Sequence, residues 1–174
     1  MKPYKNILIT GAKNSGKSTL ANWFLDLLDC KYAGFRTVQA FETDAGPLYE
    51  MEDILSGQKQ LISAYVNERI RGIESAFEEF GVLLLENALQ SDAPVILTDE
   101  IGRFERHCTR FLEQVQKIAD SEKLGILLLK KEDLPHIQKM KEREDSLLID
   151  LDEISREEAR ELLKHILAKK EDVL

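Results

Sequence analysis

One segment near the N-terminus constrains this chain more than any other. Residues 7–20 read ILITGAKNSGKSTL, and from Gly11 to Ser18 they have the spacing G-x-x-x-x-G-K-S. Gly11 and Gly16 allow backbone conformations that turn successive N–H groups toward one point, and such a concave array binds anions. The apolar run before Gly11 predicts a buried strand, and the residues from Lys17 to Leu28 predict a helix. The positive end of that helix's dipole strengthens the same anion site.

The side chains of this loop indicate which anion it holds. Lys17 is placed to reach the β- and γ-phosphates of a nucleotide, and the Ser18 hydroxyl is placed to bind Mg²⁺. A chance match to the pattern in a chain of this length is roughly a 1% event. We therefore predict a P-loop that binds a magnesium nucleoside triphosphate. Its predicted nucleotide-binding residues are Gly11, Ala12, Lys13, Asn14, Ser15, Gly16, Lys17, Ser18 and Thr19.

Two acidic residues follow a second strand-like run, Val95–Thr98. A P-loop site needs a carboxylate at the end of a neighbouring strand, which holds Mg²⁺, usually through water. Asp99 is the candidate for this role, so Ser18 and Asp99 are the predicted metal-site residues. Glu100 is placed to orient or deprotonate a water molecule, which favours hydrolysis over transfer to an acceptor. The alternative interpretation makes both residues solvated acids between a strand and a helix.

The apolar pattern predicts an α/β fold in one domain, residues 1–174. Short apolar runs alternate with longer amphipathic stretches, which is typical of strands buried on both faces of a parallel sheet. These runs are Ile7–Thr10, Val95–Thr98, Ile126–Leu129 and Leu147–Ile149. Phe35–Phe41 and Leu48–Asp53 flank the turn signal Asp44–Pro47 and predict a hairpin. We therefore expect a mostly parallel but mixed central sheet.

Apolar residues at intervals of three and four predict the helices that cover this sheet. We expect them at Lys17–Leu28, Glu68–Gln90, Cys108–Ala119 and Ser155–Lys169. Gly81 weakens the middle of the second helix, and Glu158 forms a capping box with Ser155 at the start of the last. The charged residues of 130–133 and 139–145 are interpreted as a solvated helix face, with a lid over the nucleotide as the alternative.

Composition argues against several other classes of protein. The formal net charge is −8, from 32 acidic and 24 basic residues, and we therefore expect no nucleic-acid partner. The N-terminal apolar run is too short for a signal sequence or a membrane span, so we expect no membrane association. Cys30 and Cys108 fit no zinc spacing and predict reduced thiols in the cytoplasm. His107, His136 and His165 have no metal partner at ligand spacing and are interpreted as surface or helix residues.

Three segments together resemble the small thermophile-type nucleoside triphosphatases, also called the cancer-related nucleoside-triphosphatase family. They are GAKNSGKSTL, then GFRT at 34–37, then DEIGRFE at 99–105. The segment DSLLI at 145–149, followed by Ser155 and Arg156, resembles the final strand and helix start of the family. The resemblance covers most of the chain and implies a three-layer P-loop NTPase sandwich. It also implies slow, Mg²⁺-dependent hydrolysis of nucleoside triphosphates to diphosphate and phosphate, with broad base tolerance.

The resemblance assigns roles to individual residues. It implies that Lys17 and Ser18 act as phosphate and metal groups, and that Asp99 and Glu100 act as metal and water groups. Glu105 matches the last acid of the motif, and either faces the site or pairs with Arg103 or Arg106. The sequence departs from the family at one point. The family tends to continue from the threonine of GFRT as T-x-E-x-R, with an acid and then an arginine. Here the residues after Thr37 are Val-Gln-Ala-Phe, so both the acid and the arginine are replaced.

That departure leaves open which arginine stabilises the transferred phosphate, a contribution that is large in phosphoryl transfer. Arg36 and Arg103 lie in motif segments and are the predicted catalytic arginines, beside Lys17 and Glu100. The alternatives, most of which we expect on the surface, are Arg69, Arg71, Arg106 and Arg110.

Two other functions share this fold and loop. One is a small-molecule or nucleotide kinase, and the other is a nucleotide-dependent switch that acts on a protein partner. The guanine signature asparagine/threonine-lysine-x-aspartate does not occur in the sequence. We therefore expect ATP, GTP, CTP and UTP all to be substrates.

Overall fold

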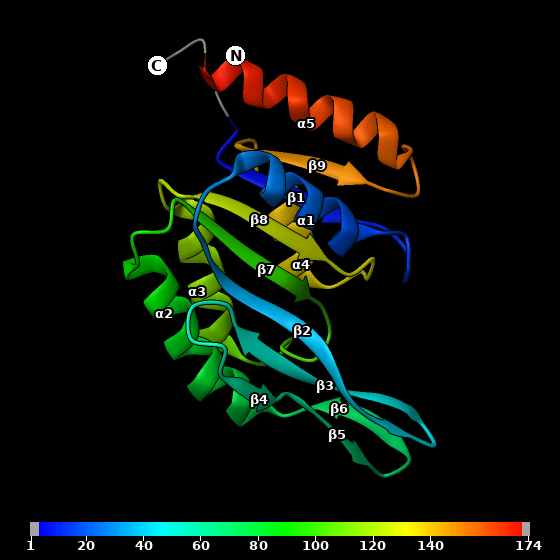
Figure 1. Ribbon diagram of the computed structural model, residues 1–174. Helices are drawn as coiled ribbons and strands as arrows, with labels where there is room; N and C mark the ends of the chain where they lie inside the picture. The colour runs from blue at the N-terminus through cyan, green and yellow to red at the C-terminus, as the bar shows by residue number, and fades with distance from the viewer. Residues whose placement is uncertain (1–3, 172–174) are drawn as a thin grey trace.

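The computed structural model describes residues 4–171 and places a seven-stranded sheet between two layers of helices (Figure 1). The strands are β1 (Asn6–Thr10), β2 (Tyr32–Thr43), β3 (Gly46–Asp53), β4 (Lys59–Leu61), β5 (Ser63–Val66), β6 (Arg69–Gly72), β7 (Val95–Ile101), β8 (Leu124–Leu129) and β9 (Ser146–Asp150). The helices are α1 (Lys17–Leu28), the π-helical η1 (Ala76–Gly81), α2 (Val82–Gln90), α3 (Thr109–Asp120), α4 (Pro135–Lys141) and α5 (Arg156–Glu171).

The sheet has the order β4-β3-β2-β7-β8-β1-β9. The five strands from β2 to β9 in this order are parallel, and β3 and β4 extend one edge in antiparallel pairing. The sheet is therefore mostly parallel and mixed, as predicted. A separate two-stranded sheet is formed by β5 and β6 and lies beside the β2–β3 hairpin (Figure 1).

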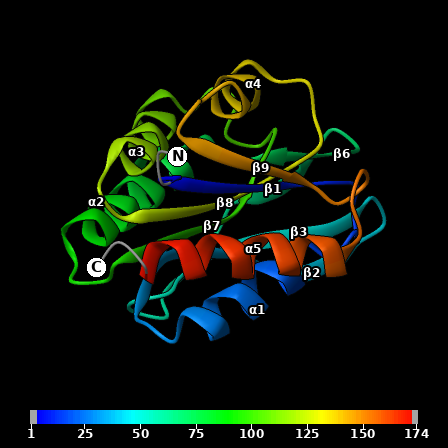
Figure 2. The same cartoon turned by 90° about the horizontal axis from the view of Figure 1, so that it is seen from above.

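Helices cover both faces of the sheet because its central strands are apolar on both sides. Seen from above, α1 and α5 lie on one face, and α2, α3 and α4 lie on the other (Figure 2). Successive residues of β1 alternate between the two cores. Ile7 and Ile9 pack with Phe24 of α1, whereas Leu8 belongs to the core that contains Phe111 of α3. This alternation explains the uninterrupted apolar runs of the sequence.

The order of the strands corrects one expectation. The acid-bearing strand β7 was expected beside β1, but β8 lies between them and pairs with both. The carboxyl ends of β1, β8 and β7 nevertheless point to the same side of the molecule (Figure 1). The residues that follow all three strands therefore meet at one edge of the sheet, which is where α/β proteins of this type bind ligands.

The second predicted helix begins later than expected. Residues 69–72 form β6 instead, which pairs with β5 across a turn where Asn67 and Glu68 have φ values of 49° and 60°. Gly81 marks the change from the π-helical η1 to α2. A Cβ added there would lie 2.8 Å from the ring of Phe111, so glycine lets this helix pack closely against α3. The other predicted helices differ from α1, α3 and α5 by at most two residues at each end.

Gly34 fixes the course of β2 beside β7. Its φ is 108°, and a Cβ added there would lie 1.9 Å from the carbonyl oxygen of Leu97. Only glycine fits this close approach of two strands. The following residues continue the parallel ladder, in which Arg36 is the register partner of Asp99. The glycine of the GFRT segment is therefore needed for strand packing, and it brings that segment beside the acidic pair.

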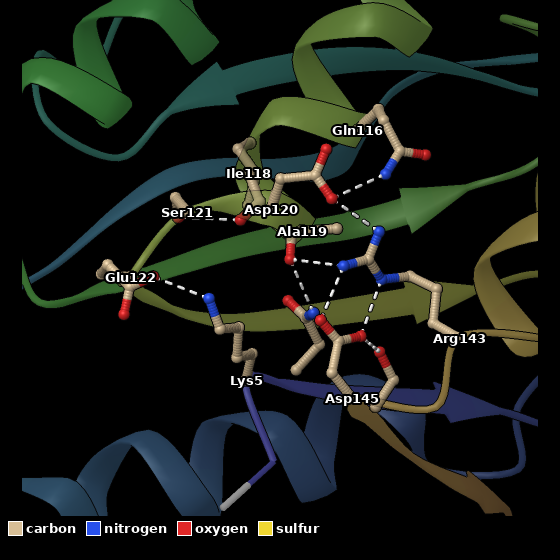
Figure 3. A network of polar contacts seen from close by, with 11 residues as sticks. Lys5, Gln116, Ile118, Ala119, Asp120, Ser121, Glu122, Arg143 and Asp145 are labelled. Carbon is tan, nitrogen blue, oxygen red and sulfur yellow. Dashed lines mark hydrogen bonds and ion pairs between the residues drawn. The ribbon is translucent and has the colours of Figure 1, made fainter.

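A polar network ties the opposite, amino-terminal edge of the sheet together (Figure 3). Arg143 donates hydrogen bonds to both Asp145 carboxylate oxygens, at 2.9 and 2.8 Å, and to Asp120 at 2.8 Å. The carbonyl oxygen of Ala119 accepts from Arg143 and from the side-chain amide of Asn6, each at 3.0 Å. These contacts join the end of α3 to β1 and to the turn before β9. Their role is structural, because they lie at the edge away from the P-loop.

Candidate active site

The segment Gly11–Ser18 folds as the connection between β1 and α1. Gly11, Asn14 and Gly16 have φ values of 141°, 64° and 102°. A Cβ added to Gly11 would lie 2.7 Å from the Ser15 hydroxyl oxygen, and one added to Gly16 would lie 2.9 Å from Arg156 Cδ. Both glycines of the motif are therefore required by backbone conformation, because other residues rarely adopt these φ values. The loop has the tight, concave course that its spacing predicts.

Lys17 carries the most buried positive charge of the loop, with 8% of the residue exposed. Its Nζ donates to the carbonyl oxygens of Gly11 and Ala12 at 3.0 and 3.1 Å. Nζ also forms an ion pair with Glu100 Oε2 at 3.2 Å. A buried ammonium group needs such partners to offset the loss of water. Lys17 and Glu100, predicted from separate motifs, are therefore in direct contact.

Asp99 lies at the carboxyl end of β7 and is 9% exposed. Burial raises the pKa of its carboxyl to about 6, and a polar contact with the Ser18 hydroxyl opposes this rise. The neighbouring charge of Glu100 raises the pKa further, whereas Arg36 and Lys17 lower it. A carboxylate that loses solvation in this way gains from a nearby cation.

The oxygen atoms of Ser18 and Asp99 suit magnesium better than they suit a metal that takes all its ligands from the protein. Ser18 and Asp99 offer a hydroxyl and a carboxylate oxygen at one place, and Mg²⁺ prefers oxygen ligands. Among residues 4–171 there is no group of three or more histidine, cysteine, aspartate or glutamate side chains that could hold a metal ion. Magnesium commonly uses one or two protein ligands and takes the rest from water and substrate phosphates. Ser18 and Asp99 are residues that would hold it here.

Glu100 lies between two lysines. Its Oε2 contacts Lys17 Nζ at 3.2 Å, and its Oε1 lies 3.8 Å from Lys130 Nζ. The Glu100 backbone N–H donates to the Thr37 hydroxyl oxygen at 3.3 Å, so the GFRT segment helps to fix the position of the acid. Glu100 is half-buried and lines the cavity described below, where a water molecule can reach it.

The structure resolves the two interpretations of Glu105 in favour of the site. The residue is 2% exposed and accepts a hydrogen bond from the Gly102 backbone N–H. It pairs with neither candidate arginine, since Arg103 faces Glu132 at 4.0 Å and Arg106 contacts His107. Burial raises the pKa of the Glu105 carboxyl to about 7. Glu105 is therefore a positioning residue that holds the loop after Glu100.

His136 also holds this loop. Its Nε2 lies 2.8 Å from the carbonyl oxygen of Gly102, and the side chain is half-buried. The interpretation of His136 as an ordinary surface or helix residue was therefore incomplete. Gly102 is fixed on both sides, at its N–H by Glu105 and at its carbonyl by His136.

The burial of Glu105 predicts a measurable pH dependence of stability. The folded-state pKa of about 7 lies above the ordinary value of 4.5. The folded protein therefore holds this proton more tightly than the unfolded chain, and stability falls as pH rises from 4.5 through 7. Between pH 6 and 8 we expect the free energy of unfolding to fall by roughly 1 kcal/mol from this group. Urea unfolding at the two pH values measures it.

Glu105→Gln is the matched variant, because the amide oxygen can still accept from Gly102. Asp99 also makes stability fall as pH rises. Its pKa of about 6 is lower than that of Glu105, so it contributes less to the decline in stability between pH 6 and 8. We expect the variant to lose most of the decline between pH 6 and 8. A variant whose stability falls as steeply as that of the wild type contradicts this assignment.

The two predicted catalytic arginines lie in different surroundings. Arg36 donates to Asn22 Oδ1 at 2.6 Å and to the Tyr32 hydroxyl at 2.8 Å, and it does not line the cavity. Its charge lowers the pKa of Asp99 from nearby. Arg103 lines the rim of the cavity, but 55% of its side chain is exposed. The structure therefore brings neither guanidinium against Lys17 or Glu100.

Lys130 is a site residue that the sequence interpretation missed. It was assigned to a solvated helix face, but it directly follows the end of β8 and reaches Glu100. A signal was available, since Ile126–Leu129 was a predicted strand and residues just beyond carboxyl ends of parallel strands commonly form sites.

The β9–α5 connection supports the outer side of the loop and was also missed. Lys131 contacts Asp150 at 3.0 Å and Asp152 at 2.8 Å, and the Asp152 carboxylate accepts from the Ala12 N–H at 3.1 Å. Arg156, at the start of α5, packs its side chain over Gly16. These residues are far from the loop in the chain, so no local sequence pattern links them to it. Ala12 and Asp152, for example, are 140 positions apart.

These groups open into one cavity of about 880 Å³. One end is polar and is formed by the loop, Asp99, Glu100 and Lys130. A second group of lining residues, mostly apolar, comes from the β2–β3 hairpin, from β6, from η1 and from the segments next to them. This group includes Ala45, Pro47, Tyr49, Ile62, Ile70, Phe77 and Phe104. Because Lys17 contacts Glu100, a nucleotide held by the loop would direct its terminal phosphate toward Glu100.

Comparisons with known proteins agree with this architecture. The crystal structure of THEP1 from the hyperthermophile Aquifex aeolicus has a TM-score of 0.72 to this chain at 24% sequence identity. The match covers 91% of this chain and 98% of that one. It confirms the predicted fold, a three-layer α/β sandwich of the P-loop type.

Sequence comparison reaches the family. Nucleoside-triphosphatase THEP1 from Thermotoga maritima is 34% identical over 167 residues, which is 93% of each chain. Nucleoside-triphosphatase THEP1 from Korarchaeum cryptofilum is 28% identical over 159 residues, covering 86% of this chain and 81% of that relative. The family model described as NTPase matches residues 6–167. The P-loop, the acidic pair at the carboxyl end of β7 and these matches lead to one conclusion: the chain belongs to the nucleoside-triphosphatase family.

Proposed function

We propose that this protein hydrolyses nucleoside 5′-triphosphates to diphosphate and phosphate in a Mg²⁺-dependent reaction with broad base tolerance. Membership of the nucleoside-triphosphatase family supports the general activity. The observation that carries the proposal for this chain is the meeting of Lys17, Asp99 and Glu100 at one end of a cavity. In this arrangement Lys17 supplies a positive charge for the phosphates, Asp99 a carboxylate for the metal site, and Glu100 a candidate base.

The reaction follows from the roles of these residues. The N–H groups of the loop and the N-terminus of α1 hold the phosphates, and Lys17 reaches the β- and γ-phosphates. Glu100 accepts a proton from a water molecule as the water oxygen attacks the γ-phosphorus. The bond from the γ-phosphorus to the bridging oxygen then breaks, and the nucleoside diphosphate leaves. Thr37 holds the Glu100 backbone, and Glu105 holds the neighbouring Gly102 backbone, so that only the Glu100 side chain needs to move toward the water.

Ser18 and Asp99 are the proposed magnesium-site residues. Bound between them and the substrate, Mg²⁺ would neutralise charge on the β- and γ-phosphates. We expect EDTA to reduce phosphate release to the level of a protein-free blank, and excess Mg²⁺ to restore it. Phosphate release that persists after complete removal of divalent cations contradicts the metal assignment.

Broad base tolerance is supported by the position of the polar groups. The charged residues that line the cavity all lie in the P-loop or α1, at or just after the end of β7, or just after β8, namely Lys13, Lys17, Asp99, Glu100, Arg103, Glu105, Lys130, Lys131 and Glu132. The sequence also lacks the guanine signature. Phosphate release from ATP, GTP, CTP and UTP, measured side by side, tests this proposal. Turnover of one triphosphate with rejection of the other three would show a base-specific site instead.

We also propose a single domain in a reducing, cytoplasmic setting. Both hydrophobic cores pack on the same central sheet, which supports one domain. Cys30 and Cys108 are both free thiols, which supports a reducing compartment. Within residues 4–171, no helix is long and apolar enough to cross a membrane.

A kinase remains the second candidate because of the apolar residues that line the cavity. Tyr49, Ile70 and Phe104 line the same cavity as Glu100, and an acceptor with an apolar body could present a hydroxyl group there. Glu100 would then take the proton of that hydroxyl rather than of water. The two functions differ in where the γ-phosphate goes, to an acceptor molecule or into solution as free phosphate.

A further inference from the structure

We propose that Lys130 is a catalytic residue and that Lys17 and Lys130 together form a clamp for the terminal phosphate. In this arrangement Lys130 supplies the positive charge that an arginine supplies in other phosphoryl-transfer sites. The inference rests on the proposed function and names a residue that no motif of the sequence predicts.

The position of Glu100 marks the site of the clamp. Its carboxylate lies between two ammonium groups, 3.2 Å from Lys17 Nζ and 3.8 Å from Lys130 Nζ. Two lysines that hold one carboxylate form an anion site. A phosphate oxygen can accept hydrogen bonds from the same two ammonium groups. Lys17 is the lysine that the loop directs at the γ-phosphate. In the proposed clamp, Lys130 contacts the same phosphate as Lys17.

The surroundings of Lys130 aim its side chain at this point. A Cβ added to Gly102 would lie 2.6 Å from Lys130 Cδ, so the stem passes directly over the glycine. Gly102 is itself held by Glu105 and His136. Nζ lies 5.1 Å from the centre of the Phe104 ring, and the Lys130 N–H donates to Ile101 at 2.8 Å. A long lysine loses less freedom on binding when its stem is packed in advance.

The sheet order explains why this position serves the reaction. Because β8 lies between β1 and β7, a residue just beyond its carboxyl end faces both the P-loop and the acidic pair. The predicted arginines do not offer the same placement. Arg36 is turned to Asn22 and Tyr32, and Arg103 is held at the rim near Glu132.

The chemical consequence is an exchange of anions. When the triphosphate binds, its γ-phosphate oxygens take the place of the Glu100 carboxylate between the two lysines. Glu100 is then free to accept a proton from the attacking water. Lys130 keeps its own proton throughout and stabilises charge on the equatorial oxygens as the bond to the diphosphate breaks.

Lys130→Met is the test variant, because it keeps the packed stem over Gly102 and Phe104 and removes the charge. We expect kcat for ATP to fall by about 10²- to 10³-fold, the range for loss of one preorganised donor. The affinity for β,γ-imido-ATP should fall while the affinity for ADP stays unchanged, because ADP has no γ-phosphate. Lys130→Arg should restore part of the kcat. Lys139→Ala, an exposed lysine on α4, is the matched control.

Three results would overturn the proposal. The first is a Lys130→Met enzyme with wild-type kcat. The second is an equal loss of affinity for ADP and β,γ-imido-ATP, which indicates a structural role. The third is a large drop in melting temperature in both Lys130→Met and Lys130→Arg, while Lys139→Ala keeps the melting temperature of the wild type. Failure of the proposed function is distinguishable, because the wild type would then release no phosphate from ATP with Mg²⁺, whereas the comparison of ADP and β,γ-imido-ATP is a binding measurement that does not depend on turnover.

Discussion

We expect Glu100→Gln to lower kcat for ATP hydrolysis by about 10³-fold, within the range for loss of a general base. Glutamine has nearly the same shape as glutamate but cannot accept a proton from water at neutral pH. The variant should bind β,γ-imido-ATP at least as tightly as the wild type. The reason is that Glu100 contacts Lys17 and Lys130 in the free protein, and in the proposed clamp the γ-phosphate has to displace it from them. Single-turnover phosphate release and calorimetric binding measure the two quantities.

Glu113→Gln, which removes an exposed acid on α3, is the control for the change in charge. The assignment is wrong if Glu100→Gln hydrolyses ATP at the wild-type rate. It is also wrong if the variant loses hydrolysis only because it no longer binds the analogue, since Glu100 would then serve binding rather than proton transfer.

The second large effect concerns Lys17→Ala. We expect the affinity for ATP to fall by about 10²-fold or more, because truncating one partner of a buried charge pair costs about 2–5 kcal/mol. Lys17 is largely buried and is placed to contact both terminal phosphates. ADP affinity should also fall, since the β-phosphate loses the same partner. This distinguishes Lys17 from Lys130, whose loss should spare ADP.

The control for Lys17 is Lys164→Ala on α5, because the Lys164 ammonium group forms an ion pair with Glu161 of its own helix. Circular dichroism should show that both variants are folded. A Lys17→Ala variant that binds ATP and ADP like the wild type would show that the ligand is not held by this loop.

Local spacing explains why the loop and the acidic pair were predictable. The strand, the two glycines, Lys17 and Ser18 lie within a few positions of each other, so one pattern specifies their geometry. Asp99 and Glu100 directly follow the apolar run Val95–Thr98 in the sequence and form the carboxyl end of β7 in the structure. Their contact with the loop could also be expected, because carboxyl ends of parallel strands meet at one edge of the sheet.

The β5–β6 hairpin was missed because its residues also fit a helical pattern. Ile70, Ile73 and Phe77 are spaced by three and four positions, which continues the apolar face of the true helix backward into β6. The turn at Asn67 and Glu68 has left-handed backbone angles without the glycine that usually signals such a hairpin. Strands of four residues at the surface are too short to show a clear alternation of polar and apolar residues.

The clamp lysine was missed for a different reason. Whether Lys130 faces solvent or the site depends on β8 lying between β1 and β7, and strand order is set by long-range packing. Arg36 shows the converse case. It lies in a motif beside Asp99, but Asn22 and Tyr32 take up its guanidinium through contacts that no spacing reveals. Side-chain direction therefore had to come from the structure.

The central claim is that water, activated by Glu100, attacks the γ-phosphorus of a triphosphate held by the P-loop. Hydrolysis of ATP in ¹⁸O-labelled water, followed by mass spectrometry of both products, tests it most directly. The account predicts ¹⁸O in inorganic phosphate and none in ADP, with the reaction lost in Glu100→Gln. Label in the nucleotide, release of pyrophosphate, or a γ-phosphate recovered on a third molecule would contradict it.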